Sequence, residues 1–587
     1  MKKDAESNLF NIAKMRPMDL FRVCGYAFSP LSSTLFLLLL IFSGVETYLG
    51  NIIGTQPSKI YGYISSRDNK SFGNCLLYYF LWLSLICVHI SIKLWISDRL
   101  SIILRDKLVK KIHEKYFAQN AFFDLLLFSA HIDNPDARIA SDCTNWAQTI
   151  CLIAIQLTMM PIYVVWYGIK TFQMMGGYAV LICLCFAILS VFFSWLVMSP
   201  IVKLTYSFEA ANGDYRLQNV LIKDNSEIIA LSQGQQKEKE MLDLRLIQAL
   251  DIQKGLANYS ILMNVLTNIF NYFGNGLIYI CIYACQPDGL DEDGIASFIS
   301  LVSFVTIEFI YGLTMIVLVM QNIAKLTGYS TRIHELWTVL LEHKSKIHSI
   351  ETGNKIEMKN VTVTKPNGEV LIRNLSFLIT PSHALLSSDS LTQSDSLDNS
   401  DSIKHLDSLG NPDSLMIAGP SGCGKSSILR TLGKIWPAAE GDMILPVKSP
   451  NSLLVLPQKP YLPYGSLYDC CAFPLTANEI DKDKILAGLN FFNLTHLISR
   501  SEDWQLGLSP GEKQRIALIR VFVHHPQFLI LDEATSAISQ QLELKFYEKI
   551  KEMNIAVLSV AHHQYLKKYH NQYLEINNDG TYTLTKL

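Results

Sequence analysis

The stretch GPSGCGKSS, Gly419 to Ser427, follows the apolar run Leu415–Ala418 and precedes a helical pattern over Ile428–Ile435. A strand that enters a glycine-rich loop and leaves it as a helix is the context in which a P-loop binds phosphate. The glycines let backbone N–H groups face phosphate oxygens, and the helix adds its positive N-terminal end. We therefore predict an α/β domain that binds a nucleotide. Its candidate phosphate-binding residues are Gly419, Pro420, Ser421, Gly422, Cys423, Gly424, Lys425, Ser426 and Ser427.

Four side chains of this domain are candidates for the chemistry of ATP. Lys425 would reach the β- and γ-phosphates, and Ser426 would ligate magnesium. A second apolar run, Phe528–Leu531, ends in Asp532 and Glu533. Paired carboxylates usually lie on a solvated strand edge, but beside a P-loop Asp532 would hold the magnesium shell and Glu533 would orient or deprotonate the attacking water. The two segments together predict hydrolysis of ATP with magnesium.

The part of the chain before this domain is rich in apolar stretches. Of its 587 residues, 49% are hydrophobic and 17% are charged, whereas soluble proteins average about 25% charged residues. Stretches of about 20 apolar residues, enough to cross a bilayer as helices, lie at 31–53, 75–96, 146–168, 176–198, 259–284 and 295–322. We therefore predict a multi-domain membrane protein: a cytosolic segment 1–30, a six-span all-α transmembrane domain 31–348, and a P-loop nucleotide-binding domain 349–587.

The loops between the spans predict the orientation, because Lys and Arg are retained on the cytosolic side. The loops after the second and fourth spans are rich in Lys and Arg, whereas residues 286–294 contain neither and carry four acidic residues. Both termini would then lie in the cytosol. The first outer loop, with Lys59, Arg67 and Lys70, is an exception. No cleavable signal peptide is apparent in residues 1–30.

The net charge, the cysteine spacing and one Ser/Asp-rich segment give no sign of nucleic-acid binding or of a zinc site. The net charge of -2 provides no basic field for nucleic acid, so no such partner is expected. The twelve cysteines lack the spacing of a zinc site. Residues 387–414 repeat an Asp-Ser-Leu unit with little to bury, which predicts a low-complexity disordered insertion. A phosphorylated regulatory loop is the alternative for that segment.

The stretch LSPGEKQR, Leu508–Arg515, resembles the signature motif of ATP-binding cassettes, and the likeness extends over nearly the whole chain. The resemblance implies that ATP lies between two facing subunits, each completing the other's site. It also implies that Gln458 senses magnesium and the γ-phosphate, and that His562 is the switch histidine beside the catalytic Glu533. The residues that would contact the partner's nucleotide are Ser509, Pro510, Gly511, Glu512 and Gln514.

Three departures from the cassette pattern stand out. Pro510 occupies a position where the family usually has Gly, and Ser539 one where it usually has Asp. No aromatic residue for stacking adenine occurs in Val361–Gly368. Every group needed for metal, phosphate and water is nevertheless present, so we expect hydrolysis, and the departures favour a slow rate.

Two cytosolic segments indicate which subfamily of ATP-binding cassette proteins the chain resembles. IDNPDARIASD, Ile132–Asp142, and EAANGDYRLQNVLIKDNSEIIAL, Glu209–Leu231, are similar to motifs of the subfamily D half-transporters. The alternative is an ordinary helix-capping loop, because Asp133 and Asp136 suit helix starts. Within the subfamily, the chain is most similar to the lysosomal branch, whose cargo is cobalamin. Three features carry this similarity: a short segment before the first span, a signature motif that begins Leu-Ser-Pro-Gly, and Ser539 in place of Asp.

The resemblance leaves three functions open. The first is a homodimer in the lysosomal membrane that moves cobalamin from lumen to cytosol, with a membrane partner that helps to sort it there. The protein would reach the lysosome through the ER, where the sequon Asn69-Lys70-Ser71 could be glycosylated. The second is a peroxisomal transporter of very-long-chain acyl-CoA. The third is an ATP-gated regulator of another membrane protein. The sequence predicts no cargo-contacting residue, and it does not decide between homodimer and heterodimer.

Overall fold

The computed structural model describes residues 17–128, 132, 134–285, 292–342, 350–381, 412–436, 438–447, 449–499 and 507–587. The chain forms two compact units: Met1–Leu125 with Ser129–His343, and Leu126–Phe128 with Lys344–Leu587. Sequence analysis placed the boundary between residues 348 and 349. Most of the segment 1–30, the acidic loop near 286–291 and nearly all of the insertion 387–414 lie outside the described residues.

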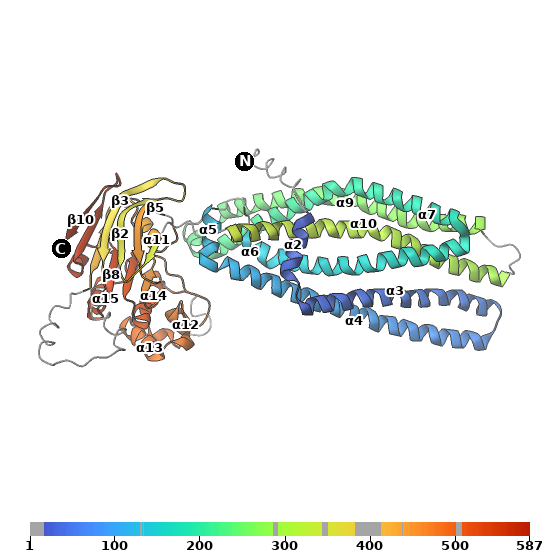
Figure 1. Ribbon diagram of the computed structural model, residues 1–587, viewed down its shortest axis with the longest axis horizontal. Helices are drawn as coiled ribbons and strands as arrows, with labels where there is room; N and C mark the ends of the chain where they lie inside the picture. Colours follow the sequence, from blue (N-terminus) through green and yellow to red (C-terminus); the bar gives the residue numbers. More distant parts are fainter. Residues whose placement is uncertain are drawn as a thin grey trace. The chain divides into compact units, whose positions relative to one another are not determined.

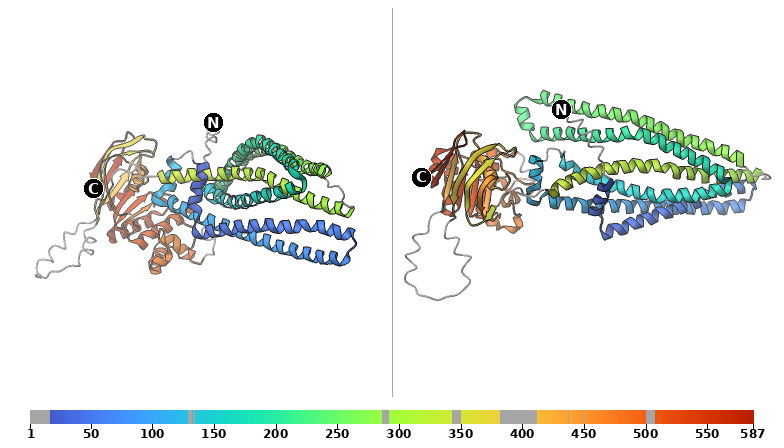
Figure 2. Two further views of the ribbon diagram at one scale, coloured as in Figure 1. Left: turned by 45° about the vertical axis from the view of Figure 1, so that its right-hand side comes forward. Right: turned by 45° about the horizontal axis from the view of Figure 1, so that its top comes forward.

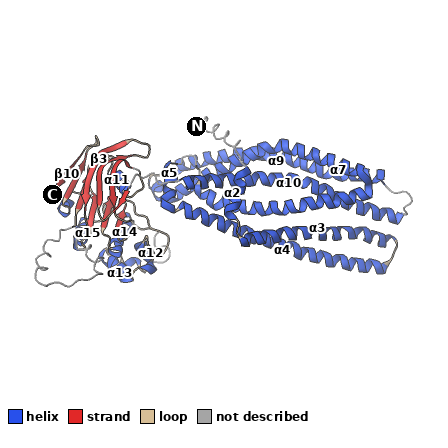
Figure 3. Ribbon diagram, viewed as in Figure 1, coloured by secondary structure: helices blue, strands red, loops and turns tan. Residues whose placement is uncertain are grey.

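All the regular secondary structure described in the first unit is helical (Figure 3). Its α-helices are α2 (Pro17–Ala27), α3 (Pro30–Ser65), α4 (Asn69–Tyr116), α5 (Ala121–Phe128), α6 (Pro135–Ala137), α7 (Cys143–Asp224), α8 (Ser226–Leu231), α9 (Gln235–Cys285) and α10 (Glu292–Glu342). A 3-10 turn (Ala118–Asn120) precedes α5, and a π-helical turn (Arg138–Asp142) joins α6 to α7. α3 packs along α4, and α7 packs along both α9 and α10, as Figures 1 and 2 show.

The outer faces of these helices carry large exposed apolar side chains, among them Phe80, Leu81, Ile188 and Trp195. An apolar surface of this extent suits lipid, because the helices satisfy their own backbone hydrogen bonds. Four described helices are long and apolar enough to cross a membrane: Pro30–Ser65, Asn69–Tyr116, Pro135–Asp224 and Gly294–Leu341. The chain is therefore an integral membrane protein.

The expected count of six spans is not confirmed. The predicted third and fourth spans lie in one long helix, α7, which breaks its helical geometry at Gly176, where φ is +76°. The predicted fifth span lies in α9, which is not among the four helices that qualify by length and hydropathy. Polar residues are interspersed along α9, so its apolar character is weaker than that of its neighbours.

The second unit contains two sheets and their helices. One has the order β1-β5-β2-β3 and the other the order β10-β9-β4-β8-β7-β6. The strands are β1 (Ile350–Thr352), β2 (Ile356–Thr364), β3 (Val370–Ile379), β4 (Ser414–Ala418), β5 (Ala438–Leu445), β6 (Leu453–Leu456), β7 (Phe528–Asp532), β8 (Ala556–Val560), β9 (Gln572–Ile576) and β10 (Tyr582–Lys586). The α-helices are α11 (Lys425–Leu432), α12 (Leu467–Ala472), α13 (Lys482–Phe491), α14 (Pro510–His524) and α15 (Gln540–Glu552).

The six-stranded sheet positions the nucleotide chemistry. Strands β9, β4, β8, β7 and β6 are parallel neighbours, and β7 and β8 are almost wholly buried, as expected of a sheet covered on both faces. The carboxyl ends of parallel strands meet at one edge, where α/β sheets bind their ligands. The residues that follow β4, β6, β7 and β8 are therefore brought together.

Candidate functional site

The P-loop, Gly419–Gly424, requires glycine at two positions for steric reasons. Gly419 has φ of +153°, and a Cβ there would lie 2.5 Å from the carbonyl oxygen of Ile576. Gly424 has φ of +107° and stands immediately before α11. Both conformations are costly for a residue with a side chain. The loop thus ends with the free N–H groups of the first turn of α11, an arrangement that favours an anion.

The ammonium of Lys425 lies inside this loop. Its Nζ donates hydrogen bonds to the carbonyl oxygens of Gly419, at 2.8 Å, and Pro420, at 2.7 Å. The side chain is 7% exposed. The loop therefore holds one positive charge where the backbone N–H groups gather. Of the other predicted phosphate-binding residues, Pro420, Ser421 and Gly422 are exposed, whereas Cys423 and Ser427 are buried.

A hydroxyl and a carboxylate meet beside the loop. The Oγ of Ser426 donates a hydrogen bond to Oδ1 of Asp532 at 3.1 Å. Burial raises the pKa of Asp532, and the hydrogen bond from Ser426 opposes that rise. No cluster of three or more His, Cys, Asp or Glu side chains suited to a metal occurs among the described residues. These two oxygens suit magnesium, which binds through few protein ligands and takes the rest of its shell from phosphates and water.

Glu533 lies at the centre of a three-residue cluster. One carboxylate oxygen accepts a hydrogen bond from Nε2 of Gln458 at 2.7 Å, and the other lies 2.9 Å from Nε2 of His562. The three residues follow β6, β7 and β8, and the order β8-β7-β6 places Glu533 in the middle. The backbone of Glu533 is left-handed, with φ of +48°, and its N–H donates to the carbonyl of Val560. Left-handed backbone at a non-glycine residue costs energy and is often found at functional sites.

The predicted signature motif forms the start of α14. Ser509 caps the helix, and its Oγ and N–H both donate to Oε2 of Glu512, at 2.9 and 2.8 Å. The hydrogen bond from the Ser509 N–H lowers the pKa of Glu512. Pro510 occupies the first helical position, where proline costs no hydrogen bond. The departure from glycine at position 510 is therefore compatible with this helix start.

Two further signature residues contact their own unit. A Cβ on Gly511 would lie 2.6 Å from the carbonyl oxygen of Ala537, so glycine is needed there for packing. The Gln514 side chain is 5% exposed, donates to the carbonyl of Gln458 at 3.2 Å and accepts from the N–H of Ala537 at 2.8 Å. Sequence analysis grouped Gln514 with the partner-facing residues, but its side chain braces two loops of its own unit. Ser509 and Pro510 are exposed.

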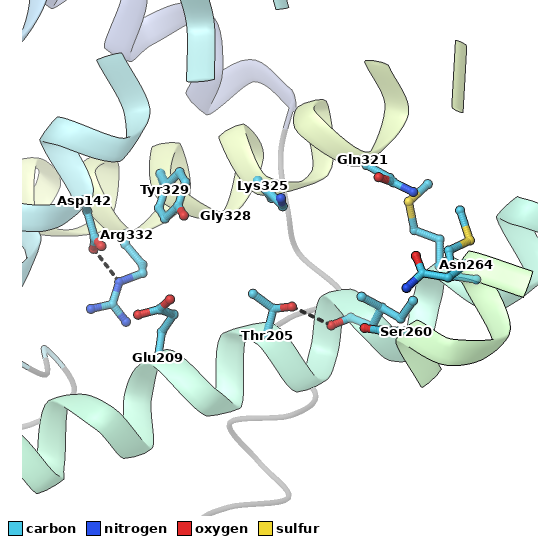
Figure 4. A pocket seen from close by; sticks show the side chains of 13 residues that line it. Asp142, Thr205, Glu209, Ser260, Asn264, Gln321, Lys325, Gly328, Tyr329 and Arg332 are labelled. Carbon is cyan, nitrogen blue, oxygen red and sulfur yellow. Dashed lines mark hydrogen bonds and ion pairs between the residues drawn. The ribbon is translucent and has the colours of Figure 1, made fainter. Parts of the chain in front are cut away.

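The structure also shows a site that sequence analysis did not identify. A cavity in the helical unit is lined by residues of α7, α9 and α10 and by Asp142 (Figure 4). Asp142 and Glu209, which line it, belong to the two segments that resemble subfamily D motifs. The sequence held one signal of this cavity: charged residues such as Lys325 and Arg332 lie just beyond the end of an apolar span.

Comparison with known proteins identifies relatives along the whole chain. Residues 26–285 match the family model "ABC transporter transmembrane region 2", and residues 408–536 match the model "ABC transporter". The lysosomal cobalamin transporter ABCD4 of Homo sapiens is 27% identical, with 97% of this chain and 96% of the relative covered. ATP-binding cassette sub-family D member 3 of Homo sapiens is 26% identical, with 89% and 82% covered. A bacterial Atm1-family ABC exporter solved with ATP bound shares the fold, with a TM-score of 0.72 at 14% identity and 94% of each chain covered.

Proposed function

The chain is an ATP-binding cassette half-transporter of the subfamily D type, and from this premise we propose that it works as a homodimer that moves cobalamin from the lysosome lumen to the cytosol. Its ATP hydrolysis is coupled to transport. The likeness to ABCD4, which covers 97% of this chain and 96% of that relative, supports this cargo and this membrane. We place the cassette and both termini in the cytosol, and we expect a membrane partner to sort the protein to lysosomes.

The observation that supports the chemistry is the carboxylate of Glu533, held between Gln458 and His562. In this position Glu533 orients the attacking water and accepts its proton, while His562 and Gln458 fix the direction of the carboxylate. The loop amides and Lys425 hold the phosphates. Ser426 and Asp532, with Gln458, would hold magnesium, which neutralises phosphate charge when bound.

A second subunit completes each ATP site. Ser509 and Gly511 stand at the exposed start of α14, and a helix N-terminus favours an anion. We assign these residues to the γ-phosphate bound on the partner's P-loop. Glu512 accepts hydrogen bonds from the capping Ser509, and Gln514 braces two neighbouring loops, so both support this contact indirectly.

ATP-dependent uptake into liposomes tests the function. ATP is sealed inside for cobalamin, which should move toward the cassette, and ATP is added outside for acyl-CoA, which a peroxisomal transporter would move away from the cassette. Purified protein is offered cobalamin and, separately, a very-long-chain acyl-CoA, with Glu533→Gln as the inactive control. Uptake of cobalamin alone is the expected result. Uptake of acyl-CoA alone would make the protein a transporter of the peroxisomal type, and uptake of neither, with ATP hydrolysis intact, would favour an ATP-gated regulator.

A further inference from the structure

The cavity in the helical unit has a volume of about 230 Å³. Three helices line it: α7 with Met198, Ile201, Thr205 and Glu209, α9 with Ser260, Met263 and Asn264, and α10 with Gln321, Lys325, Gly328, Tyr329 and Arg332. Figure 4 shows side chains of these helices pointing toward one another across the open space. None of them takes part in the nucleotide chemistry.

The charges around the cavity balance. The Nε of Arg332 donates to Oδ2 of Asp142 at 2.6 Å, and both side chains are 12% exposed. Glu209 lies close to the Arg332 guanidinium, and Lys325 lies on the same helix as Arg332 (Figure 4). Two carboxylates and two cations give a formal charge of zero. The lining therefore presents no net positive field to a multiply charged anion.

The rest of the lining combines neutral polar groups with apolar ones. Asn264 and Gln321 supply amides, which donate and accept hydrogen bonds at once. Three hydroxyls and three apolar side chains complete this part of the lining, from Thr205, Ser260, Tyr329, Met198, Ile201 and Met263. An acyl chain here would cover the amides of Asn264 and Gln321 without offering them hydrogen-bond partners, which is costly. The phosphates of a CoA group would meet as many carboxylates as cations, so the lining gives them no net attraction.

We infer that this cavity binds an uncharged, amide-bearing part of the cargo, with Asn264 and Gln321 as its hydrogen-bonding residues. Cobalamin fits this chemistry, because its corrin ring carries primary amides along an otherwise apolar edge. Sites for drug-sized ligands measure about 300–1,000 Å³, so the cavity holds one edge of such a cargo. The inference rests on the proposed function, and it adds the contact that favours cobalamin over acyl-CoA.

Filling the cavity tests the inference. A Cβ on Gly328, which lines the cavity, would meet no atom within 4 Å, so Gly328→Leu adds bulk without a clash at its first carbon. Gly276 of α9 also has open space and does not line the cavity, so Gly276→Leu is the matched control. Binding of radiolabelled cobalamin is measured on purified full-length protein in nanodiscs. ATP binding and a cooperative melting transition show that each variant is folded.

We expect Gly328→Leu to weaken cobalamin binding at least about tenfold, equivalent to about 1.4 kcal/mol, and Gly276→Leu to bind as the wild type does. Gln321→Met, which keeps the length of the side chain and removes the amide, should weaken binding several-fold. Equal binding by wild type and Gly328→Leu would overturn the inference, as would a wild-type protein that binds no cobalamin.

The vesicle assay separates this inference from the proposed function. If wild type and Gly328→Leu take up cobalamin with the same KM, the cargo assignment stands and the cavity assignment fails. If cobalamin binds, and Gly328→Leu abolishes that binding, but the wild type moves no cobalamin, the cavity assignment stands and the transport function fails.

Discussion

At the scale of single residues, the carboxylate of Glu533 is the group on which turnover depends. We expect Glu533→Gln to lower ATP hydrolysis at least about 100-fold, because general-base groups contribute about 10²–10⁴ to rate. ATP binding should persist, because the P-loop is unchanged. Glu552→Gln, at an exposed ion pair with Lys549, is the control. Near-normal hydrolysis by Glu533→Gln would contradict its assignment as the base.

Lys425 acts in binding rather than in turnover. Its ammonium is the charge held inside the P-loop, and hydrogen bonds to charged groups contribute about 1.5–3 kcal/mol. Lys425→Ala should therefore weaken ATP binding roughly 10–100-fold in a fluorescent-nucleotide titration. Lys484→Ala, at an exposed position of α13, should bind ATP normally. Equal affinity in the two variants would show that Lys425 does not hold the phosphates.

His570 makes the stability of the nucleotide-binding unit sensitive to acid. Its ring is buried, with Nδ1 2.9 Å from the carbonyl of Leu566 and Nε2 3.0 Å from the hydroxyl of Ser559. Burial lowers its pKa from 6.5 to about 4. Between these pH values the unfolded chain binds a proton that the folded chain does not, so stability falls as pH drops and is fully present above 6.5.

The loss over this range is up to about 3 kcal/mol, at roughly 1.4 kcal/mol for each pKa unit. Melting curves of the full-length protein between pH 7 and pH 4 measure it, with His570→Gln as the comparison. The wild type should lose more stability than the variant across this range. A parallel decline in the two proteins would argue against His570 as the source.

At the scale of elements, Arg332 joins the turn before α7 to α10. It pairs with Asp142, and its own carbonyl accepts a hydrogen bond from Arg138, which also pairs with Glu335. The two segments that resemble subfamily D motifs also meet, since a Cβ on Gly213 would lie 2.9 Å from the amide of Asn134. Asp136 lies in the first turn of α6, as a helix-capping interpretation expects, while Asp133 lies outside the described residues. The contact between these two segments thus supports a role in joining the helices of this unit, beyond capping the start of one helix.

Breaking the Asp142–Arg332 pair should destabilise the helical unit. Removing one partner of a buried pair costs about 3–5 kcal/mol when the other charge is left alone; here Glu209 remains beside Arg332, so the loss should be smaller. We expect Asp142→Asn to lower the melting temperature in detergent, and the exchange Asp142→Arg with Arg332→Asp to recover part of the loss. An exposed pair, Lys237–Glu240, is the control, and Glu240→Gln there should change little. A stability unchanged in Asp142→Asn would contradict the role of this pair.

At the scale of the whole molecule, the assignment of ATP sites shared between two subunits has a direct test. Lys425→Ala removes the P-loop cation, and Ser509→Asp places a carboxylate at the exposed signature while keeping a residue that suits the N-cap of α14. Each homodimer should be inactive. A mixed dimer, isolated with two different tags, keeps one intact P-loop facing one intact signature and should retain about half the wild-type hydrolysis if the sites act independently. Complete inactivity of the mixed dimer would contradict sites built from both subunits.

The sequence by itself determined the features that are local in the chain. The P-loop, the strand ending in Asp532 and Glu533 and the signature helix are each read from a few consecutive residues, because glycine placement, apolar runs and capping residues act over one turn or one strand. The apolar stretches likewise predicted a membrane protein. The number of spans was not determined in this way, since α9 is too polar to qualify and α7 joins two predicted spans.

The tertiary structure alone decided which distant residues meet. Glu533 contacts Gln458 and His562 because β6, β7 and β8 are neighbours, and Gln514 turns into its own unit because two loops converge there. The cavity likewise needs three helices whose contributions begin near residues 198, 260 and 321. The physical reason is that charge pairing and packing depend on distances in space, whereas propensity and periodicity depend on neighbours in the chain.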